Sequence, residues 1–322
     1  MAVFWLILGL VMLVGGAEVV VKYGTRLAYR LHVSPIIIGL TVVSIGTSAP
    51  ELAVGIDGMV KGQGNLVLGN IVGTNIVNLL LILGLAAMIR SVAIRRSTLK
   101  LDLPAMVAAS LLLLVIALDG DLSTWDGLIL LSLGMAYMWT VVATARRRTA
   151  GSVETDDEGA AEVQVPRPGA KRALGDLALI VVGIAVIVVG ADRLVTGAVG
   201  IATSLGVSDA VIGLTVVAIG TSAPELATTI MATIRKQRAI AIGNLLGSST
   251  LNLTLILGAS LLFGPSAVAV DRTLVTVDLP IMVAVALVCI PIFTTGRQIS
   301  RREGAFMVAA YLGYLTFLVV TA

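Results

Sequence analysis

The sequence predicts an all-α integral membrane protein with ten transmembrane helices, arranged as two inverted five-helix repeats. Composition, apolar segments and an internal repeat predict this class. Of 322 residues, 57% are hydrophobic and 13% are charged, against about 25% charged residues in an ordinary soluble domain. A mean hydropathy of +1.03 excludes a disordered chain, a soluble enzyme and a nucleic-acid-binding protein. The lipid bilayer is the expected partner, and no feature indicates an obligatory protein partner or a cofactor.

Apolar segments of about 20 residues, the length that crosses a bilayer, follow one another along the chain. The first segment lacks the basic residues that precede a cleavable signal peptide, so we interpret it as a membrane helix. Charged and turn-rich breaks predict helices at 3–27, 35–60, 65–89, 100–118, 124–145, 173–200, 209–234, 239–263, 274–294 and 303–321. The long polar stretch 146–172, between the fifth and sixth helices, is expected to be a linker.

The two halves of the chain repeat one another. Residues 39–53 and 213–227 agree at 14 of 15 positions, at an offset of 213 − 39 = 174 residues. The predicted domains are therefore a first five-helix repeat at 1–145 and a second at 173–322. Because five is an odd number, the second copy enters the membrane in the opposite orientation. This is the inverted repeat found in many secondary transporters.

The basic residues predict the orientation in a cell (plasma or inner) membrane. If the N-terminus lies outside, all Lys and Arg residues except Lys61, Arg193 and Arg272 fall on the cytoplasmic side, which is 19 of 22. Cytoplasmic loops of membrane proteins carry such an excess. We therefore expect both termini outside and the linker in the cytoplasm.

Each repeat carries Gly-Thr-Ser-Ala-Pro-Glu inside an apolar helix, at 46–51 and 220–225. Proline has no N–H, so a backbone carbonyl one turn earlier loses its helical partner. Freed carbonyls are tolerated at membrane depth only when they are buried in protein or line a polar cavity. The predicted helix-breaking residues are Gly46, Pro50, Gly220 and Pro224.

Two carboxylates at mid-membrane, Glu51 and Glu225, are expensive unless they are compensated. Each lies four residues after a threonine, Thr47 or Thr221, and so shares a helix face with it. If the repeat brings the carboxylates together, they repel, and a divalent hard cation with oxygen ligands neutralises both. A proline kink with a snorkelling glutamate explains one copy of the motif better than two.

The following helix of each half adds oxygen ligands at helical spacing: Thr74 with Asn78, and Ser248 with Asn252. These asparagines could instead join neighbouring helices. The glycines spaced by four before them, at 69 and 73 and at 243 and 247, favour helix packing. No imidazole or thiolate accompanies these oxygens, so Ca²⁺ and Na⁺ fit the site better than zinc or copper.

Other polar residues have local explanations. Glu18 is followed one turn later by Lys22, which predicts a local ion pair, and its counterpart Asp192 is followed by Arg193. The sequences Asp-Leu-Pro at 102–104 and 278–280 are expected at helix starts, with Asp near a cap and Pro in the first turn.

The paired motifs resemble the cation/Ca²⁺ antiporter superfamily, specifically its prokaryotic Na⁺/Ca²⁺ exchanger family. They are G-T-S-A-P-E-L at 46–52 and 220–226, G-N-I-V-G-T-N-I-V-N at 69–78 and G-N-L-L-G-S-S-T-L-N at 243–252. The resemblance covers nearly the whole chain. It implies a secondary antiporter rather than an enzyme, which exchanges Na⁺ for Ca²⁺ by alternating access.

The resemblance also implies particular ligands. Ca²⁺ would be held by Glu51 and Glu225 with the carbonyls of Thr47 and Thr221. Na⁺ sites would draw on Ser44, Ser48, Thr74, Asn78, the Ala218 backbone, Ser222, Ser248 and Asn252. Family members often carry Asp where this chain has Asn252, so this site has one carboxylate fewer.

Three alternatives stay open. On the same fold, Ca²⁺ could be exchanged for H⁺, or exchange could require K⁺. A passive cation channel would conduct Ca²⁺ without a counter-ion, and the inverted repeat argues against it. An intramembrane hydrolase could use two facing glutamates, but no nucleophile accompanies them.

Overall fold

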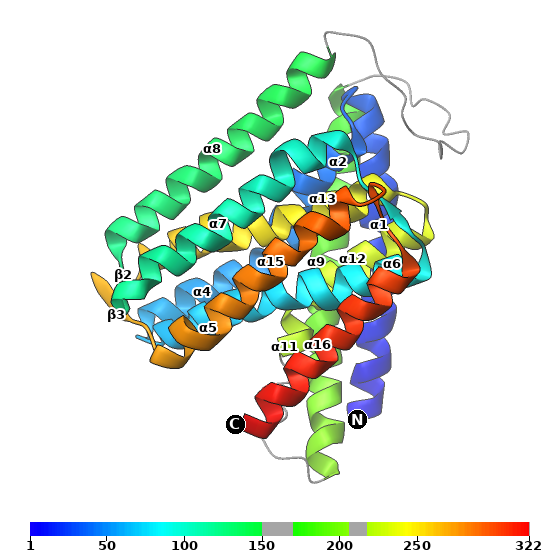
Figure 1. The fold of residues 1–322 in the computed structure, drawn as a ribbon. Coiled ribbons are helices and arrows are strands. Elements are labelled where there is room, and N and C mark those ends of the chain that lie inside the picture. The colour runs from blue at the N-terminus through cyan, green and yellow to red at the C-terminus, as the bar shows by residue number, and fades with distance from the viewer. Residues whose placement is uncertain (150–169, 206–217, 322) are drawn as a thin grey trace.

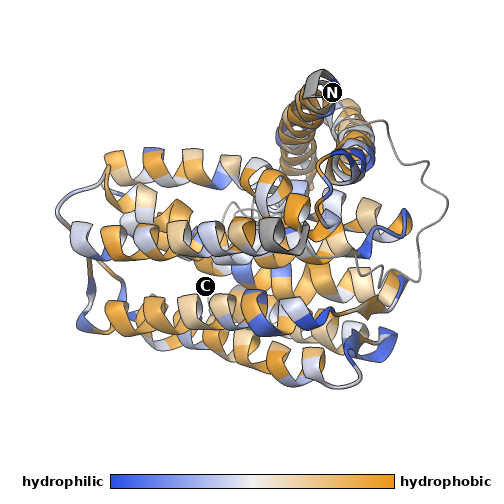
Figure 2. Cartoon of the chain, turned by 90° about the horizontal axis from the view of Figure 1, so that it is seen from above, coloured by the Kyte–Doolittle hydropathy of each residue, from blue (hydrophilic) through white to orange (hydrophobic). Residues whose placement is uncertain are grey.

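The computed structural model describes residues 1–149, 170–205 and 218–321, and this part of the chain is almost entirely helical. Two long helices, α1 (Ala2–Arg30) and α9 (Ala170–Ser204), stand side by side at one edge of the molecule (Figure 1). The other helices cross them at a steep angle and form a larger bundle, which Figure 2 shows from above.

The larger bundle takes its helices from both halves of the chain. The first half supplies α2 (Pro35–Ile38), the π-helical turn η1 (Gly39–Val43), α3 (Ser44–Thr47), α4 (Ala49–Val60), α5 (Gly64–Ile76), η2 (Val77–Ile82), α6 (Leu83–Ile89), β1 (Val92–Ala93), η3 (Thr98–Asp102), α7 (Leu103–Ile116), the 3-10 turn η4 (Ala117–Asp119), β2 (Asp121–Ser123) and α8 (Thr124–Thr149).

The second half supplies elements in the same order. They are α11 (Ala218–Thr221), α12 (Ala223–Ile234), α13 (Arg238–Leu251), η6 (Asn252–Ile256), α14 (Leu257–Leu261), β3 (Ala267–Ala269), η7 (Leu274–Asp278), α15 (Leu279–Thr294), β4 (Gln298–Ile299) and α16 (Arg301–Thr321).

Most of the expected membrane helices are present. Seven described helical segments are long and apolar enough to cross a bilayer, and the pair α2–α3 and α4, bent by 42° at their junction, makes an eighth. Of the two remaining expected helices, 209–234 lies partly outside the described residues, and α16 is a helix of 21 residues. The chain is thus a multi-pass membrane protein.

The helix ends differ from expectation mainly beside the linker. The fifth expected helix continues to Thr149, and the sixth begins at Ala170 and ends at Ser204. Seven residues of the stretch predicted as linker are therefore helical, four at its start and three at its end. Charged residues such as Arg146 ended the apolar segment in the sequence, but a helix can continue into water once its apolar part is anchored.

α1 and α9 run antiparallel and approach closely at glycines. A Cβ added to Gly9 would stand 2.6 Å from the carbonyl oxygen of Gly190, and one added to Gly16 would stand 2.8 Å from that of Gly183. Small residues allow such backbone contact in a membrane. Adding 174 turns Gly9 into Gly183 and Gly16 into Gly190. The repeat offset therefore exchanges these two contacts.

Two short antiparallel ladders join the halves of the chain. β1 pairs with β4, and β2 pairs with β3. Each half contributes a strand after its third span and a strand after its fourth, so exchanging the halves exchanges the ladders. Because η3, α7 and η4 connect β1 to β2, the ladders lie at opposite ends of one span.

Tyrosine hydroxyls stabilise the two Asp-Leu-Pro segments. Tyr137 donates to Asp102 at 3.2 Å, and Tyr314 donates to Asp278 at 3.1 Å. The helices begin four residues before these aspartates, at Thr98 and Leu274, so the prediction that Asp caps the helix was wrong. A π-helical turn precedes each aspartate, and the sequence pattern gave no sign of it.

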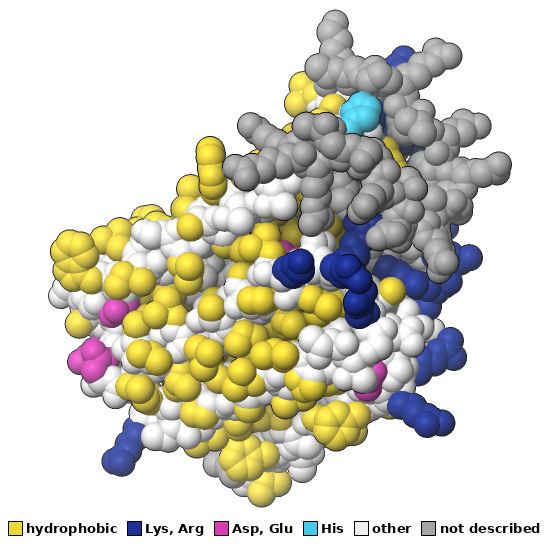
Figure 3. All heavy atoms as spheres, turned by 45° about the horizontal axis from the view of Figure 1, so that its top comes forward, with side chains coloured by type: hydrophobic (Ala, Val, Ile, Leu, Met, Phe, Trp, Pro, Cys, Tyr) yellow, Lys and Arg dark blue, Asp and Glu magenta, His cyan; other side chains and the backbone are white. Residues whose placement is uncertain are grey.

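Charge separates between the two ends of the bundle. At one end, Arg95 donates to Ser34 at 2.6 Å, and Arg301 donates to the Ile89 carbonyl at 3.1 Å. Lys and Arg side chains gather toward that end on the face drawn in Figure 3, beyond an apolar surface. The other end carries the β2–β3 ladder. This distribution agrees with the sequence pattern, although it does not say which end faces the cytoplasm.

Candidate functional site

The two Gly-Thr-Ser-Ala-Pro-Glu segments break their helices in the same way. α3 gives way to α4 at Ser48 (φ −86°, ψ 7°), and α11 gives way to α12 at Ser222 (φ −85°, ψ 4°). Pro50 and Pro224 follow in the first turn of the new helix, where a missing N–H is tolerated. Identical local sequence therefore produces identical backbone geometry in both halves.

Each break brings a carboxylate to the start of a helix. Glu51 lies in the first turn of α4, and Glu225 lies in the first turn of α12. The first N–H groups of a helix carry partial positive charge, which stabilises a carboxylate there. The break thus lowers part of the cost of a charged side chain at membrane depth.

Glu225 is fully buried and receives hydrogen bonds from both halves of the chain. The hydroxyl of Ser48 donates to Oε1 at 3.1 Å, and that of Ser248 donates to the same oxygen at 3.4 Å. The second carboxylate oxygen, Oε2, is buried without a hydrogen-bond partner among the described residues. Half of this carboxylate is therefore held by the protein, and half is available to a ligand.

Glu51 is 1% exposed, and neither of its carboxylate oxygens has a hydrogen-bond partner in the described part of the chain. It lies near enough to Glu225 for the two charges to repel. Two buried like charges are very unfavourable unless a cation neutralises them. The prediction that the repeat brings these carboxylates together is thus supported by their electrostatic interaction.

The third and eighth spans surround the carboxylates with further polar groups. Asn78 lies in η2 and Asn252 begins η6, and both are fully buried. π-helical turns inside α-helices occur often at functional sites. Within the described chain, buried side-chain atoms without partners occur on Thr74, Asn78, Ser222 and Asn252. Four predicted ligands therefore have unused hydrogen-bonding capacity.

Other predicted ligands already make contacts within the protein. The Ser44 hydroxyl donates to the Leu40 carbonyl at 2.7 Å, and the Thr47 hydroxyl donates to Asn244 at 3.2 Å. Thr221 ends α11 and is half-buried, and Ala218 is the first described residue of α11.

A second polar network was missed by sequence reasoning. The Asn244 side-chain amide donates to the hydroxyls of Thr228 at 2.9 Å and Thr229 at 3.2 Å, and its oxygen accepts from Thr47. It therefore joins α13 and α12 to α3. The Gly-Asn pair that repeats at 69–70 and 243–244 was the available signal.

The glycines act in packing. Gly46 and Gly220 stand two residues before the breaks, and a side chain on either would collide with α9, at Ile184 and Val195 respectively. Gly243 packs tightly against η1, since a Cβ there would lie 2.5 Å from the Ile36 carbonyl oxygen. The corresponding segment for the first copy, near 210–214, lies outside the described residues.

Glu18 does not form the predicted ion pair with Lys22. Instead, Arg235, the residue after α12, holds it with two contacts of 2.7 Å between guanidinium and carboxylate. The expected pair of Asp192 with Arg193 is present, at 3.6 Å. The i,i+4 spacing suggested a local partner, but tertiary packing offers a bidentate one.

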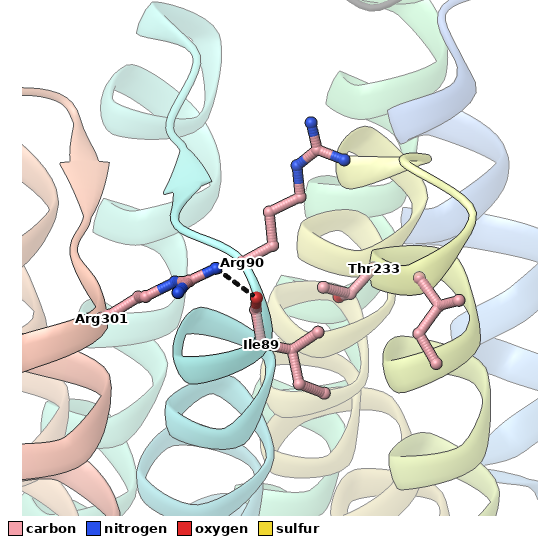
Figure 4. A pocket seen from close by; sticks show the side chains of 5 residues that line it. Ile89, Arg90, Thr233 and Arg301 are labelled. Atoms are coloured by element: carbon pink, nitrogen blue, oxygen red, sulfur yellow. Dashed lines mark hydrogen bonds between the residues drawn. The ribbon is translucent and has the colours of Figure 1, made fainter.

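A surface cavity of about 490 Å³ opens at the ends of α6, α12 and α16. Figure 4 shows its lining, which includes Ile89, Arg90, Thr233 and Arg301, with Arg301 donating to the Ile89 carbonyl. No carboxylate lines it, so it lies apart from the candidate cation site.

The family model for sodium/calcium exchanger proteins matches residues 1–143 and 176–320. The chain belongs to the sodium/calcium exchanger family. The two matched ranges leave out the stretch between the halves and cover both broken-helix motifs. The family is one of membrane transporters that carry Na⁺ and Ca²⁺ by antiport, not of enzymes.

Similar proteins cover this exchanger along its whole length. Sodium/calcium exchanger MaX1 of Methanosarcina acetivorans is 34% identical, with 97% of each chain covered. Inner membrane protein YrbG of Escherichia coli is 33% identical, over 97% of this chain and 95% of YrbG. The structure of the sodium-calcium exchanger NCX_Mj soaked with 10 mM Na⁺ and zero Ca²⁺ superposes with a TM-score of 0.82, at 28% identity and 98% coverage of both chains.

Proposed function

We propose that this exchanger moves Na⁺ against Ca²⁺ by alternating access around Glu51 and Glu225. The observation that carries the proposal is a cluster of buried oxygens without partners among the described residues: both carboxylate oxygens of Glu51, one of Glu225, and the amide oxygens of Asn78 and Asn252. Buried unpaired oxygens cost several kcal/mol each unless a ligand compensates them. Ca²⁺ takes six to eight oxygen ligands and Na⁺ also prefers oxygen, so both ions suit this set.

In this proposal Ca²⁺ and Na⁺ compete for one carboxylate cluster. Ca²⁺ binds between Glu51 and Glu225 with the carbonyls of Thr47 and Thr221. The remaining proposed ligands serve the Na⁺ sites: Ser44, Ser48, Thr74, Asn78, the Ala218 backbone, Ser222, Ser248 and Asn252. Either load neutralises the two glutamates and allows the site to pass through a closed state. The empty charged site crosses poorly, which makes transport an exchange rather than a leak.

The proposed architecture is ten spans in two inverted repeats, at 1–145 and 173–322, joined by 146–172. Three exchanges under the repeat support it: the glycine contacts of α1 with α9, the two strand ladders, and the Tyr–Asp hydrogen bonds. An inverted repeat can reach two access states by exchanging the conformations of its halves.

The proposed orientation has both termini outside and 146–172 in the cytoplasm of a cell membrane. The basic end of the bundle supports it, because cytoplasmic loops are enriched in Lys and Arg. The similarity to a protein named for the inner membrane of Escherichia coli supports the location.

The test is Ca²⁺ uptake into vesicles that contain the purified protein and are loaded with Na⁺. The vesicles are diluted into Na⁺-free buffer, and controls carry K⁺ inside or a pH gradient alone. We expect uptake only with internal Na⁺. Uptake driven by the pH gradient alone would replace the proposal with proton coupling, and uptake without any counter-ion would indicate a channel.

A further inference from the structure

We infer that two ion pairs form alternately and bias the protein between its two access states: Glu18 with Arg235 in this structure, and Asp192 with Lys61 in the opposite state. The inference rests on the proposed alternating access and assigns roles to four charged residues outside the cation site. Each pair would join the α1–α9 pair to one of the broken helices.

The first pair is formed in this structure. Glu18 lies on α1, and Arg235 directly follows α12, the helix that carries Glu225. Two guanidinium nitrogens lie 2.7 Å from the two carboxylate oxygens. The geometry is bidentate, which is the strongest arrangement for an arginine–carboxylate pair. It holds α1 against the end of α12.

The second pair is the image of the first under the repeat. The offset of 174 converts Glu18 into Asp192 and Lys61 into the position of Arg235, so each acidic and each basic residue has a counterpart of the same charge. In this structure the counterparts have other partners: Asp192 contacts Arg193 at 3.6 Å, and Lys61 contacts Asp57 at 2.6 Å. Both substitutes lie on the residue's own helix or at its end.

Helix packing has the same asymmetry as the ion pairs. α1 packs extensively along α12, whereas α9 has no comparable packing along α4 in the described chain. These are equivalent pairs in the two halves. Exchanging the halves gives a state in which α9 packs along α4. Asp192 then approaches Lys61, and Glu18 leaves Arg235.

The α1–α9 pair can make this change as one body. Arg30 on α1 forms an ion pair with Asp176 on α9, and both side chains are largely buried, at 10% and 5% exposed. The glycine contacts lie inside the same helix pair. Because the helices are antiparallel, Glu18 and Asp192 lie on opposite sides of its middle. A shift along the bundle can therefore break one pair and form the other.

The exposure of the first pair suits a switch. The side chains of Glu18 and Arg235 are 33% and 57% exposed. Solvent weakens such pairs, so removing one is expected to shift a two-state equilibrium only about two- to fivefold. A much stronger pair would hold the exchanger in one state and slow its cycle.

Cross-linking tests the two pairs directly. In a Cys289→Ala background, Glu18→Cys/Arg235→Cys and Lys61→Cys/Asp192→Cys are treated in vesicles with a short bifunctional thiol reagent, in Na⁺, in Ca²⁺ and without either ion. We expect both pairs to cross-link, with yields that change in opposite directions among the conditions. Cross-linking of 18 with 235 but never of 61 with 192 overturns the inference, as does failure of both pairs.

Charge removal tests the bias. Adding Glu18→Gln to the Lys61→Cys/Asp192→Cys protein is expected to raise that cross-link about two- to fivefold. Lys22→Gln, one turn along the same helix, is the matched control and should leave the yield unchanged. Equal yields in both variants would contradict the inference. If Glu18→Gln folds poorly, Glu18→Arg with Arg235→Glu should restore the parental yield.

These readouts do not require transport. If the cross-links alternate but Na⁺ does not drive Ca²⁺ uptake, the alternating pairs remain and the proposed ions are wrong. If Na⁺ drives Ca²⁺ uptake but the cross-links do not alternate, the proposed exchange remains and the alternating pairs are wrong.

Discussion

At the scale of single residues, the site depends on where oxygen atoms are left unpaired. Glu225 shares one carboxylate oxygen with two serine hydroxyls, while both oxygens of Glu51 are unpaired among the described residues. Glu51 is therefore expected to interact with the cation more completely. Both residues supply the negative charge that a divalent ion needs.

Glu51→Gln and Glu225→Gln should each abolish Na⁺-dependent Ca²⁺ uptake, because an amide keeps the shape of the side chain but removes its charge. The measurement is uptake by vesicles, with monodisperse elution from a sizing column as the check on folding. Glu303→Gln, a carboxylate at the start of α16 far from the site in sequence, is the control for loss of a negative charge. Normal exchange in either site variant would exclude the two-glutamate site.

Asn252→Asp should lower the Na⁺ concentration needed for half-maximal exchange, since a third carboxylate strengthens cation binding. Asn252 is fully buried and its side-chain oxygen has no partner within the described residues. The measurement is Ca²⁺ uptake as internal Na⁺ is varied. An unchanged Na⁺ dependence would show that this position does not tune the site.

At the scale of elements, short local signals decide where helices break and where they touch. Pro50 and Pro224 predict the breaks, and both follow them by two residues. The tight contacts of α1 with α9 depend instead on glycines whose role becomes clear only when the partner helix is known. Two adjacent glycines on α1 separate these effects.

Gly16→Ala should lower the thermal stability of the purified protein, whereas Gly15→Ala should not. A Cβ at Gly16 would lie 2.8 Å from the Gly183 carbonyl oxygen, while none of the described atoms lies within 4 Å of one at Gly15. Overpacking of this kind costs about 1–3 kcal/mol, and Gly→Ala in an open helical position gains up to about 1 kcal/mol. Thermal unfolding in detergent measures both. Equal changes in the two variants would mean that α1 and α9 do not pack tightly there.

At the scale of the whole molecule, charge separation predicts how the bundle lies in the membrane. In a Cys289→Ala background, Arg302→Cys and Ser152→Cys should be protected from an impermeant thiol reagent added to intact cells, and Arg272→Cys should be labelled. Cys289 is 1% exposed and its replacement removes background reactivity. Labelling of Arg302→Cys but not Arg272→Cys from outside would reverse the orientation.

The sequence by itself determined the membrane class, most of the spans and the candidate ligands. These follow from local signals: apolar length predicts a span, proline predicts a break, and two nearly identical segments 174 residues apart predict equivalent positions. Glu51, Glu225, Asn78 and Asn252 could be chosen because charged and amide groups are costly inside a bilayer and are therefore rare there.

Only the tertiary structure decided which partners the polar side chains use. Asn244 contacts threonines 15 and 16 residues away and one 197 residues away, and Glu18 contacts Arg235 rather than its sequence neighbour Lys22. The symmetry of the repeat also could not reveal that α1 packs along α12 while α9 lacks the equivalent contact with α4. A sequence repeat specifies equivalent elements, but one access state requires the two halves to pack differently. That difference arises from contacts between residues far apart in the chain.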